Sequence, residues 1–418
     1  MQKYKNLKEN KEKYDENIIT VLDIGTSNIV VVVVKIISKK NFEIIGISKQ
    51  KSYGIIKGMI TNINIIINSL KKVFEDIELT VNYKIKNVYT NITGSHIRSF
   101  NSSGIIAVKN DKITSLDVCK VIEIAKSINI KNNNKIIHIL IQDFIIDEKY
   151  KVQEPIGMNG IKLEVRVNII TCSFSAYKNI VNCIKKCGVE IKGLVVQSLS
   201  SSLACLKKHE KEIGVLLIDI GGGTTDLSIF IGGSIYHSAV IPIAGDQITN
   251  DISTMLHIPV EEAEEIKLKY GAAKKIFSTL ETIIEIPGKK NKQNKVIKHK
   301  DLCDIIESRI EELFLIIKKL LIDSDYNELI SSGVVITGGT SKIKGIIELS
   351  EDIFKFPTRI AYPNYIKNLS NLSFDDCSSS SIGLIYEAKT KFRKNIKIYN
   401  KYKKFMRILN KIRYWFLS

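Results

Sequence analysis

Two glycine-rich turns, each opened by an aspartate, are the residues of this chain best suited to chemistry. One spans residues 23–27 (Asp-Ile-Gly-Thr-Ser) and the other residues 219–224 (Asp-Ile-Gly-Gly-Gly-Thr), and an apolar run precedes each. Because glycine has no side chain, the backbone amides of such turns can approach phosphate oxygens closely. The aspartates would repel a phosphate, so they indicate a Mg²⁺ ion or an ordered water in between. The two turns therefore predict two halves of one nucleotide cleft.

A third glycine turn, Gly338-Gly339-Thr340, follows another apolar run at 334–337. A single turn of this kind is often an ordinary β-turn. Three of them in one chain favour nucleotide binding, because each offers free backbone amides at the end of a predicted strand.

The same succession of elements is predicted after each aspartate turn. Apolar patterning predicts two further strands and then a helix in both places. The first copy has strands from residue 18, at 29–37 and at 42–48 and a helix at 62–75, and the second has strands at 214–220, 226–231 and 234–241 and a helix after Gly245. The chain therefore contains a loose duplication of one β-β-β-α plan.

Residues 87–165, between the copies, form a predicted subdomain without a phosphate-type turn, which we interpret as an inserted recognition module. Its predicted elements are strands near 88–93, 104–108, 135–144 and 162–170 and a helix at 115–127. Helices at 176–187 and 194–206 follow, and the second of these is predicted to cross between the lobes. After the second copy, residues 249–328 are predicted to be rich in helices.

Length and composition predict a folded cytoplasmic protein of two or more lobes. The chain has 418 residues, 44% of them hydrophobic, which is enough for separate cores. No apolar run is long enough to span a bilayer, and residues 1–17 are Lys-, Glu- and Asn-rich, unlike a signal peptide. The seven cysteines and six histidines show no ligand spacing, so we expect reduced thiols and no zinc site.

The end of the chain concentrates positive charge. Residues 388–418 hold eleven Lys or Arg and no acid, within a formal net charge of +18. At 100° per residue the apolar and basic side chains fall on opposite sides, which predicts a basic amphipathic helix that adsorbs to anionic lipid. The aromatic residues lie on the apolar side, which argues against nucleic acid. The predicted membrane-facing residues are Ile398, Tyr402, Phe405, Ile408, Leu409, Ile412, Trp415 and Phe416.

The duplicated aspartate turns with a later Gly-Gly turn resemble the actin, Hsp70 and sugar-kinase superfamily, in which ATP lies between two matching lobes. The resemblance narrows to the FtsA family of bacterial division proteins, and it covers the chain from about residue 18. The segments that carry it are SYGIIKGMITN at 52–62, NVYTNITGSHI at 87–97, residues 214–251 and EEAEEIKLKYG at 261–271.

This resemblance implies an α/β, two-lobed actin-like fold of duplicated βββαβα units, with an FtsA-type insertion called 1C and a C-terminal amphipathic helix. The implied division is a disordered leader at 1–17, first-lobe segments at 18–86, 166–194 and 379–392, subdomain 1C at 87–165, second-lobe segments at 195–248 and 329–378, subdomain 2B at 249–328, and a basic linker with the membrane helix at 393–418.

The family also implies roles for particular residues. Asp23 and Asp219 would hold Mg²⁺ through water beside the phosphates of ATP, and Glu264 and Lys267 would flank the sugar and base. The remaining residues implied to bind the nucleotide are Gly25, Thr26, Ser27, Gly221, Gly222, Gly223, Thr224, Gly245, Gly338, Gly339, Thr340 and Lys342.

One position departs from the family pattern. Many relatives carry a Glu-Pro pair in the helix between the lobes, where this chain has Gln197-Ser198. An amide can position a water molecule but cannot take its proton, so we expect ATP binding with slow or absent hydrolysis.

The family further implies partners and a location. Subdomain 2B would bind the C-terminal peptide of FtsZ, subdomain 1C later division proteins, and the lobes would polymerise on the cytoplasmic side of the inner membrane at the septum. Two alternatives remain open. One is a type IV pilus scaffold of the PilM kind, which shares the fold but generally lacks the basic tail, and the other is a small-molecule kinase, for which no convincing catalytic aspartate is found outside the phosphate turns.

Overall fold

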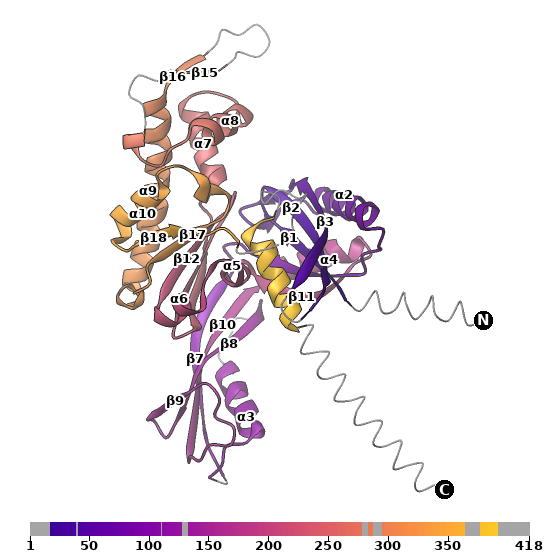
Figure 1. Ribbon diagram of the computed structural model, residues 1–418, viewed down its shortest axis with the longest axis vertical. Coiled ribbons are helices and arrows are strands. Elements are labelled where there is room, and N and C mark those ends of the chain that lie inside the picture. Colours follow the sequence, from indigo (N-terminus) through magenta and orange to yellow (C-terminus); the bar gives the residue numbers. More distant parts are fainter. Residues whose placement is uncertain are drawn as a thin grey trace, which may run out of the picture.

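The computed structural model describes residues 17–38, 41–109, 111–127, 133–277, 283–286, 295–363 and 377–391. It is a mixed α/β structure with two matching sheets side by side, a small sheet below them and a helical subdomain above the second lobe (Figure 1).

The first lobe is built on a five-stranded sheet of order β11-β6-β1-β2-β3. Its first three strands pair antiparallel, whereas β6 and β11 are parallel to β1. The strands are β1 (Ile18–Ile24), β2 (Asn28–Ile36), β3 (Phe42–Lys51), β6 (Asn87–Ile92) and β11 (Glu190–Val196), with a hairpin of β4 (Ile55–Ile56) and β5 (Met59–Ile60) and the helices α2 (Ile63–Val81) and α4 (Phe174–Lys186).

The second lobe repeats this topology. Its sheet has the order β14-β13-β12-β17-β18, again with three antiparallel strands followed by two parallel ones. The elements are α6 (Lys208–Ile213), β12 (Val215–Ile220), β13 (Thr225–Ile231), β14 (Ser234–Ile241), η2 (Asn327–Leu329), β17 (Val334–Thr337), η3 (Gly339–Lys342), α10 (Ile346–Phe354) and β18 (Thr358–Ile360). The predicted duplication is therefore confirmed as two sheets with the same strand order.

Local sequence explains why the first lobe folds this way. Strand β2 carries a run of valines, buried on both faces, because α2 covers one face of the sheet and further chain covers the other. Asn62 caps the start of α2 through its side chain, and Asn82 ends the helix in the left-handed conformation that asparagine tolerates.

The inserted subdomain is a four-stranded sheet, β7-β10-β8-β9, with α3 packed on β7 and β10. Its elements are β7 (Arg98–Ala107), α3 (Ser115–Lys126), β8 (Asn134–Ile146), β9 (Tyr150–Val152) and β10 (Lys162–Ser173). The predicted boundaries of 87–165 differ from this. Residues 87–92 are β6 of the first lobe, and β10 continues to Ser173, so the inserted sheet covers 98–173.

The helical subdomain lies between β14 and β17 and contains the α7, α8 and α9 helices. Its elements are α7 (Gly245–Met255), α8 (Val260–Tyr270), η1 (Lys275–Phe277), β15 (Ile283–Ile286), β16 (Lys295–Lys298) and α9 (His299–Asp323). Apolar side chains of α7 and α9 join one core with the second sheet, which ties this subdomain to the second lobe.

Two segments cross at the junction of the lobes. Helix α5 (Gln197–Cys205) buries four serines, and residues 379–391 form a helix that packs on the first lobe, where Tyr386 contacts Phe42. Gly383 of that helix lies so close to α5 that a Cβ there would sit 1.7 Å from the carbonyl oxygen of Ser200. Small residues are therefore required at this crossing.

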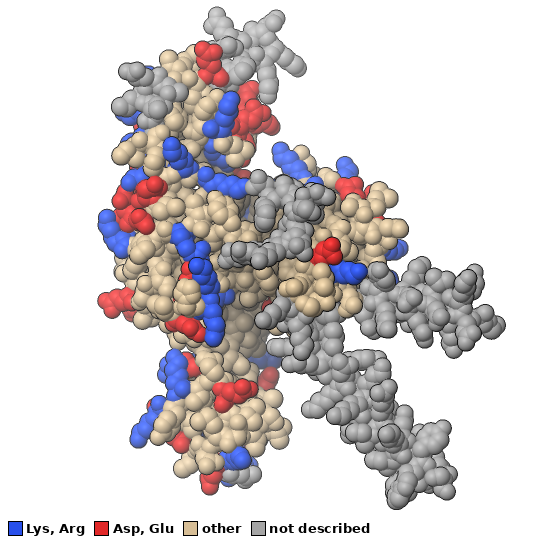
Figure 2. All heavy atoms as spheres, viewed as in Figure 1, with Lys and Arg blue, Asp and Glu red and all other residues tan. Residues whose placement is uncertain are grey.

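The predicted membrane helix at 398–417, and all of the predicted leader at 1–17 except its last residue, lie outside the described residues. Within the described ranges, no helix is both long and apolar enough to cross a membrane. On the face in view, basic and acidic side chains are interspersed over the lobes and both subdomains (Figure 2).

We expect Gly383→Ala to lower the free energy of unfolding by about 1–3 kcal/mol, because the new methyl group meets backbone that cannot move aside. This cost exceeds the roughly 1 kcal/mol that alanine gains over glycine in a helix. Urea denaturation measures it. Thr390→Ala, at an exposed position of the same helix, is the matched control and should change stability by less than about 0.5 kcal/mol.

Candidate functional site

The two predicted aspartates lie at the carboxyl ends of the central strands of the two sheets and are joined by a chain of hydrogen bonds. The Nδ2 of Asn91 donates to Asp23 Oδ1 at 2.5 Å and also to the side-chain oxygen of Gln197. The Nε2 of Gln197 donates to Asp219 Oδ2 at 3.3 Å. Gln197 is therefore placed between the lobes, as the sequence predicted, and Asn91 is a site residue that sequence reasoning missed.

The two phosphate-type turns, one from each lobe, pack directly against each other. A Cβ on Gly222 would lie 1.9 Å from Ser27 Oγ, and a Cβ on Gly223 would lie 2.6 Å from Thr26 Oγ1. The close approach of the turns thus depends on the missing side chains. Gly25, which the sequence also placed here, begins the first turn, and its amide donates to the Asn28 carbonyl at 3.0 Å.

A third buried carboxyl, Asp226, belongs to the same site. Thr93 Oγ1 lies 2.6 Å from Asp226 Oδ1 and 2.8 Å from Oδ2 and donates to this carboxylate. Thr224 Oγ1 donates to Oδ2 at 3.0 Å. Asp226 pairs with Asp219 across β12 and β13, whereas Val30 occupies the matching position opposite Asp23. The sequence signal was present in the Thr-Thr-Asp that ends the second turn, but the prediction stopped at the first threonine.

Burial dominates the electrostatics of these three groups. It raises the pKa of Asp23, raises the pKa of Asp219 to about 6, and, together with the charge of Asp219, raises the pKa of Asp226 to about 8. Protonation or a nearby cation therefore stabilises each carboxyl group, because a buried negative charge without solvent costs free energy.

The donor set suits a hydrated divalent cation better than one bound directly. Asp23 accepts hydrogen bonds from Ser378 and from Ser380, the latter at 2.5 Å, and Asp219 accepts one from Ser201 at 2.5 Å. Oxygens engaged in this way can still accept from the waters that Mg²⁺ characteristically retains. Among the described residues, no group of three or more His, Cys, Asp or Glu is arranged as a metal site.

The second lobe supplies a further set of predicted residues around the start of α7. The amide of Gly245 donates to the Gly221 carbonyl at 3.1 Å, and Lys267 Nζ donates to the Gly245 carbonyl at 3.1 Å. Lys267 also forms an ion pair with Glu264 at 2.6 Å. Glu264 and Lys267 therefore lie beside the second phosphate turn, although they follow it by some forty residues in sequence.

The third glycine turn closes this side. Thr340 Oγ1 donates to the Gly221 carbonyl at 2.8 Å. Gly338 has a φ of +93°, and a Cβ there would lie 2.5 Å from Asp219 Oδ1. Gly339 and Lys342 delimit the short η3 helix, and Lys342 is exposed. Residues 338–340 match the turn that lies beside the adenosine in the family, and we refer to them as the adenosine turn. The structure brings this turn and the second phosphate turn into one wall.

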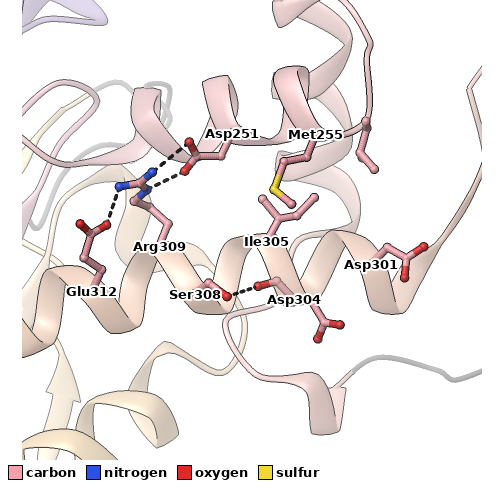
Figure 3. A pocket seen from close by; sticks show the side chains of 9 residues that line it. Asp251, Met255, Asp301, Asp304, Ile305, Ser308, Arg309 and Glu312 are labelled. Atoms are coloured by element: carbon pink, nitrogen blue, oxygen red, sulfur yellow. Dashed lines mark hydrogen bonds and ion pairs between the residues drawn. The ribbon is translucent and has the colours of Figure 1, made fainter.

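A separate pocket of about 630 Å³ lies between the far end of α7 and α9 (Figure 3). Arg309 spans α7 and α9 there, bonding Asp251 at 2.5 and 3.0 Å and also Glu312. The pocket combines an apolar part with more acidic than basic side chains. It is lined by Asp251, Met255, Leu256, Asp301, Asp304, Ile305, Ser308, Arg309 and Glu312.

Without nucleotide, we expect the free energy of unfolding of Asp226→Asn to increase relative to that of the unaltered protein as pH rises from about 4 to about 8. The folded-state pKa of Asp226 is raised to about 8 from the ordinary 3.8. The folded protein therefore retains a proton that the unfolded chain releases, which costs at most about 1.4 kcal/mol per pH unit. Urea denaturation across this range tests the trend. A constant difference would contradict it, and Asp111→Asn, the same substitution at an exposed residue, is the matched control.

Comparison with known proteins gives the family context. The profile described as "Cell division protein FtsA" matches residues 216–382, and the profile described as "SHS2 domain inserted in FTSA" matches residues 94–171. The second match agrees with the inserted sheet at 98–173 and supports its revised boundaries.

Relatives named "Cell division protein FtsA" match over most of their length. The Pseudomonas aeruginosa protein is 38% identical over 88% of both chains, and the Buchnera aphidicola subsp. Baizongia pistaciae protein is 38% identical over 94% of this chain and 97% of its own. The Escherichia coli K12 protein is 28% identical over 90% of this chain and 91% of its own.

Solved structures share the fold at low identity. The "PilM-PilN type IV pilus biogenesis complex" has a TM-score of 0.63 at 15% identity, over 89% of this chain and 98% of that chain. MreB5 of Spiroplasma citri bound to ADP has a TM-score of 0.54 at 18% identity, over 92% of this chain and 98% of that chain. The two-lobed actin-like fold is thereby confirmed. Through its full-length relatives and its two matched profiles, this chain belongs to the FtsA family of cell division proteins.

Proposed function

We propose that this protein is an ATP-binding adaptor of cell division, which holds the FtsZ ring at the cytoplasmic face of the inner membrane and recruits later division proteins. The observation that carries the nucleotide part is the meeting of the two aspartate turns, one from each lobe, with glycines at their contact. MreB5 of Spiroplasma citri, which shares the fold, has been solved bound to ADP and to AMPPNP.

In this proposal the phosphates of ATP lie between residues 23–27 and 221–224, and the adenosine lies against Gly245, Lys267 and the turn at 338–340. Bound Mg²⁺ would neutralise part of the phosphate charge. Asp23 and Asp219 would hold its water molecules, which relieves the cost of burying both carboxylates.

Hydrolysis is expected to be slow. Gln197 occupies the position between the lobes where a base would act, and its amide already bonds Asn91 and Asp219. It can orient a water molecule but cannot accept a proton from it. These residues therefore suit a protein that is regulated by whether ATP is bound better than one that hydrolyses ATP rapidly.

The pilus-scaffold and kinase alternatives have weaker support. The structural similarity to the PilM-PilN complex is accompanied by only 15% sequence identity, so it supports a shared fold and not a shared function. Asp226 is the additional buried carboxyl in the cleft, and its hydrogen bonds to Thr93 and Thr224 leave it bound to the protein itself rather than presented to a sugar.

Subdomain 2B is the proposed site for the FtsZ C-terminal peptide, and the pocket between α7 and α9 is the part of it that fits a peptide. Met255 and Ile305 offer apolar side chains, and Asp301 places an exposed negative charge at the edge, whereas Asp304 is paired with Lys275 at 3.2 Å. A peptide that combines an apolar anchor with basic residues complements this surface. The inserted subdomain would serve later division proteins, and the lobes would associate into filaments.

We expect Asp301→Lys to weaken binding of the C-terminal peptide of the same organism's FtsZ about tenfold or more, because it places like charges together at the pocket. Isothermal titration calorimetry measures the change. Glu311→Lys is the matched control, since Glu311 is also an exposed acid of α9 but does not line the pocket. Equal affinities for the two variants would count against this pocket as the peptide site.

Membrane attachment is assigned to the basic amphipathic end of the chain, which lies outside the described residues. The proposal rests on its sequence, since residues 392–418 hold nine basic residues and no acid. Basic residues near anionic headgroups contribute on the order of 1 kcal/mol each, in addition to burial of the apolar side.

We expect a chain ending at Asn395 to lose most of its sedimentation with vesicles that contain anionic lipid, while the full chain pellets with them. Neutral vesicles should pellet less of the full chain, because the electrostatic attraction is absent. Unchanged pelleting after truncation would refute the membrane assignment without affecting the nucleotide proposal.

A further inference from the structure

The hairpin of β4 and β5 brings a third element to the two phosphate turns. It pairs Ile55 with Ile60 and Ile56 with Met59, so that Lys57 and Gly58 form a two-residue turn. Both turn residues have positive φ, +50° for Lys57 and +74° for Gly58. Positive φ at both positions is typical of a type I′ turn, which fixes the direction in which the hairpin tip projects.

The hairpin is fastened to the first phosphate turn by its backbone. The amide of Gly58 donates to Thr26 Oγ1 at 3.2 Å, and the amide of Ser52, where the hairpin segment begins, donates to the Ser27 carbonyl at 2.9 Å. The tip therefore sets the position of Thr26, a residue assigned to the phosphates.

The same tip abuts the second lobe. A Cβ on Gly58 would lie 3.1 Å from the methyl group of Thr224, and equally near the backbone of Gly94. Thr224 in turn bonds Asp226 at 3.0 Å. The turn thus lies against both phosphate turns at once, and a side chain at position 58 would be tightly packed and strained by the positive φ.

The second phosphate turn gives the cleft a direction. At one end, Gly221 bonds Gly245 and Thr340 beside the adenosine turn. At the other end, Thr224 meets the hairpin tip. A nucleotide whose base lies at the first end extends its phosphates toward the second, so the terminal phosphate would lie nearest to Lys57 and Gly58.

Charge balance gives Lys57 a role there. Residues 23–27 and 219–226 contain three aspartates and no Lys or Arg. A triphosphate bound between them needs cations beyond one Mg²⁺, since buried like charges repel strongly. Lys57 is exposed and directly precedes Gly58, so it is the cationic residue of the hairpin turn.

We propose that Lys57 binds the terminal phosphate of ATP, and that the Lys57-Gly58 turn makes the cleft prefer a nucleoside triphosphate to a diphosphate. This inference rests on the proposed nucleotide site. It adds a residue outside both phosphate turns and a reason for selectivity between ATP and ADP.

The test compares dissociation constants of AMPPNP and ADP, with Mg²⁺, by displacement of a fluorescent nucleotide from the full chain. Lys57→Asn removes the charge and keeps the turn, because asparagine tolerates the left-handed conformation and Asn-Gly favours a type I′ turn. We expect it to weaken AMPPNP binding about tenfold and ADP binding by less than about twofold. Lys57→Arg should retain the preference for AMPPNP.

Lys84→Asn is the matched control, since Lys84 is an exposed lysine of the same lobe that follows α2. It should leave both constants unchanged. The inference is overturned if Lys57→Asn binds both nucleotides as the unaltered protein does, or loses both equally. Failure of the unaltered protein to bind AMPPNP would overturn the nucleotide proposal itself, and this inference with it. Thermal melting without nucleotide establishes that each variant is folded.

Discussion

The structure depends on keeping two buried carboxylates close together between the lobes. Asp23 and Asp219 end the central strands of two separate sheets, and each has its pKa raised by burial. Like charges in a low dielectric repel, so the closed arrangement requires compensation. Asn91 and Gln197 supply part of it, since their amides link one carboxyl to the other. The lobes are thus joined by the same polar groups that face the cleft.

The helices at the junction serve packing and chemistry with the same small residues. Ser201 of α5 bonds Asp219, and Ser380 of the helix at 379–391 bonds Asp23. Gly383 lets the two helices approach. Larger side chains at these positions would separate the helices and would also remove the hydroxyl donors, so close crossing and carboxylate solvation are satisfied together.

Much of the cleft could be predicted from sequence because its signals are local. An apolar strand, an aspartate and glycines stand next to one another, and each turn is recognisable without knowledge of the fold. Asn91 and Thr93 could not be predicted in this way, since their roles arise from strand order: β6 lies beside β1 only after more than sixty residues of chain. Ser378 could not be predicted either, because it reaches Asp23 from the segment before the last helix. Strand order also explains the misplaced boundary of the insertion, because β6 has the composition of any buried strand.

The orientation of α7 relates the two sites of the second lobe. At its start, the backbone amide of Asp246 donates to the Gly222 carbonyl of the second phosphate turn at 2.7 Å. At its other end, Asp251 and Met255 form part of the pocket between α7 and α9. Helix α7 has eleven residues, and its apolar side chains pack in the core of the second lobe, where close packing transmits strain. A ligand that displaced the phosphate turn would therefore shift the pocket wall, and by linkage a ligand that held the wall would bias the turn equally. The ion pair of Arg309 with Asp251 is the point at which such a shift would reach α9.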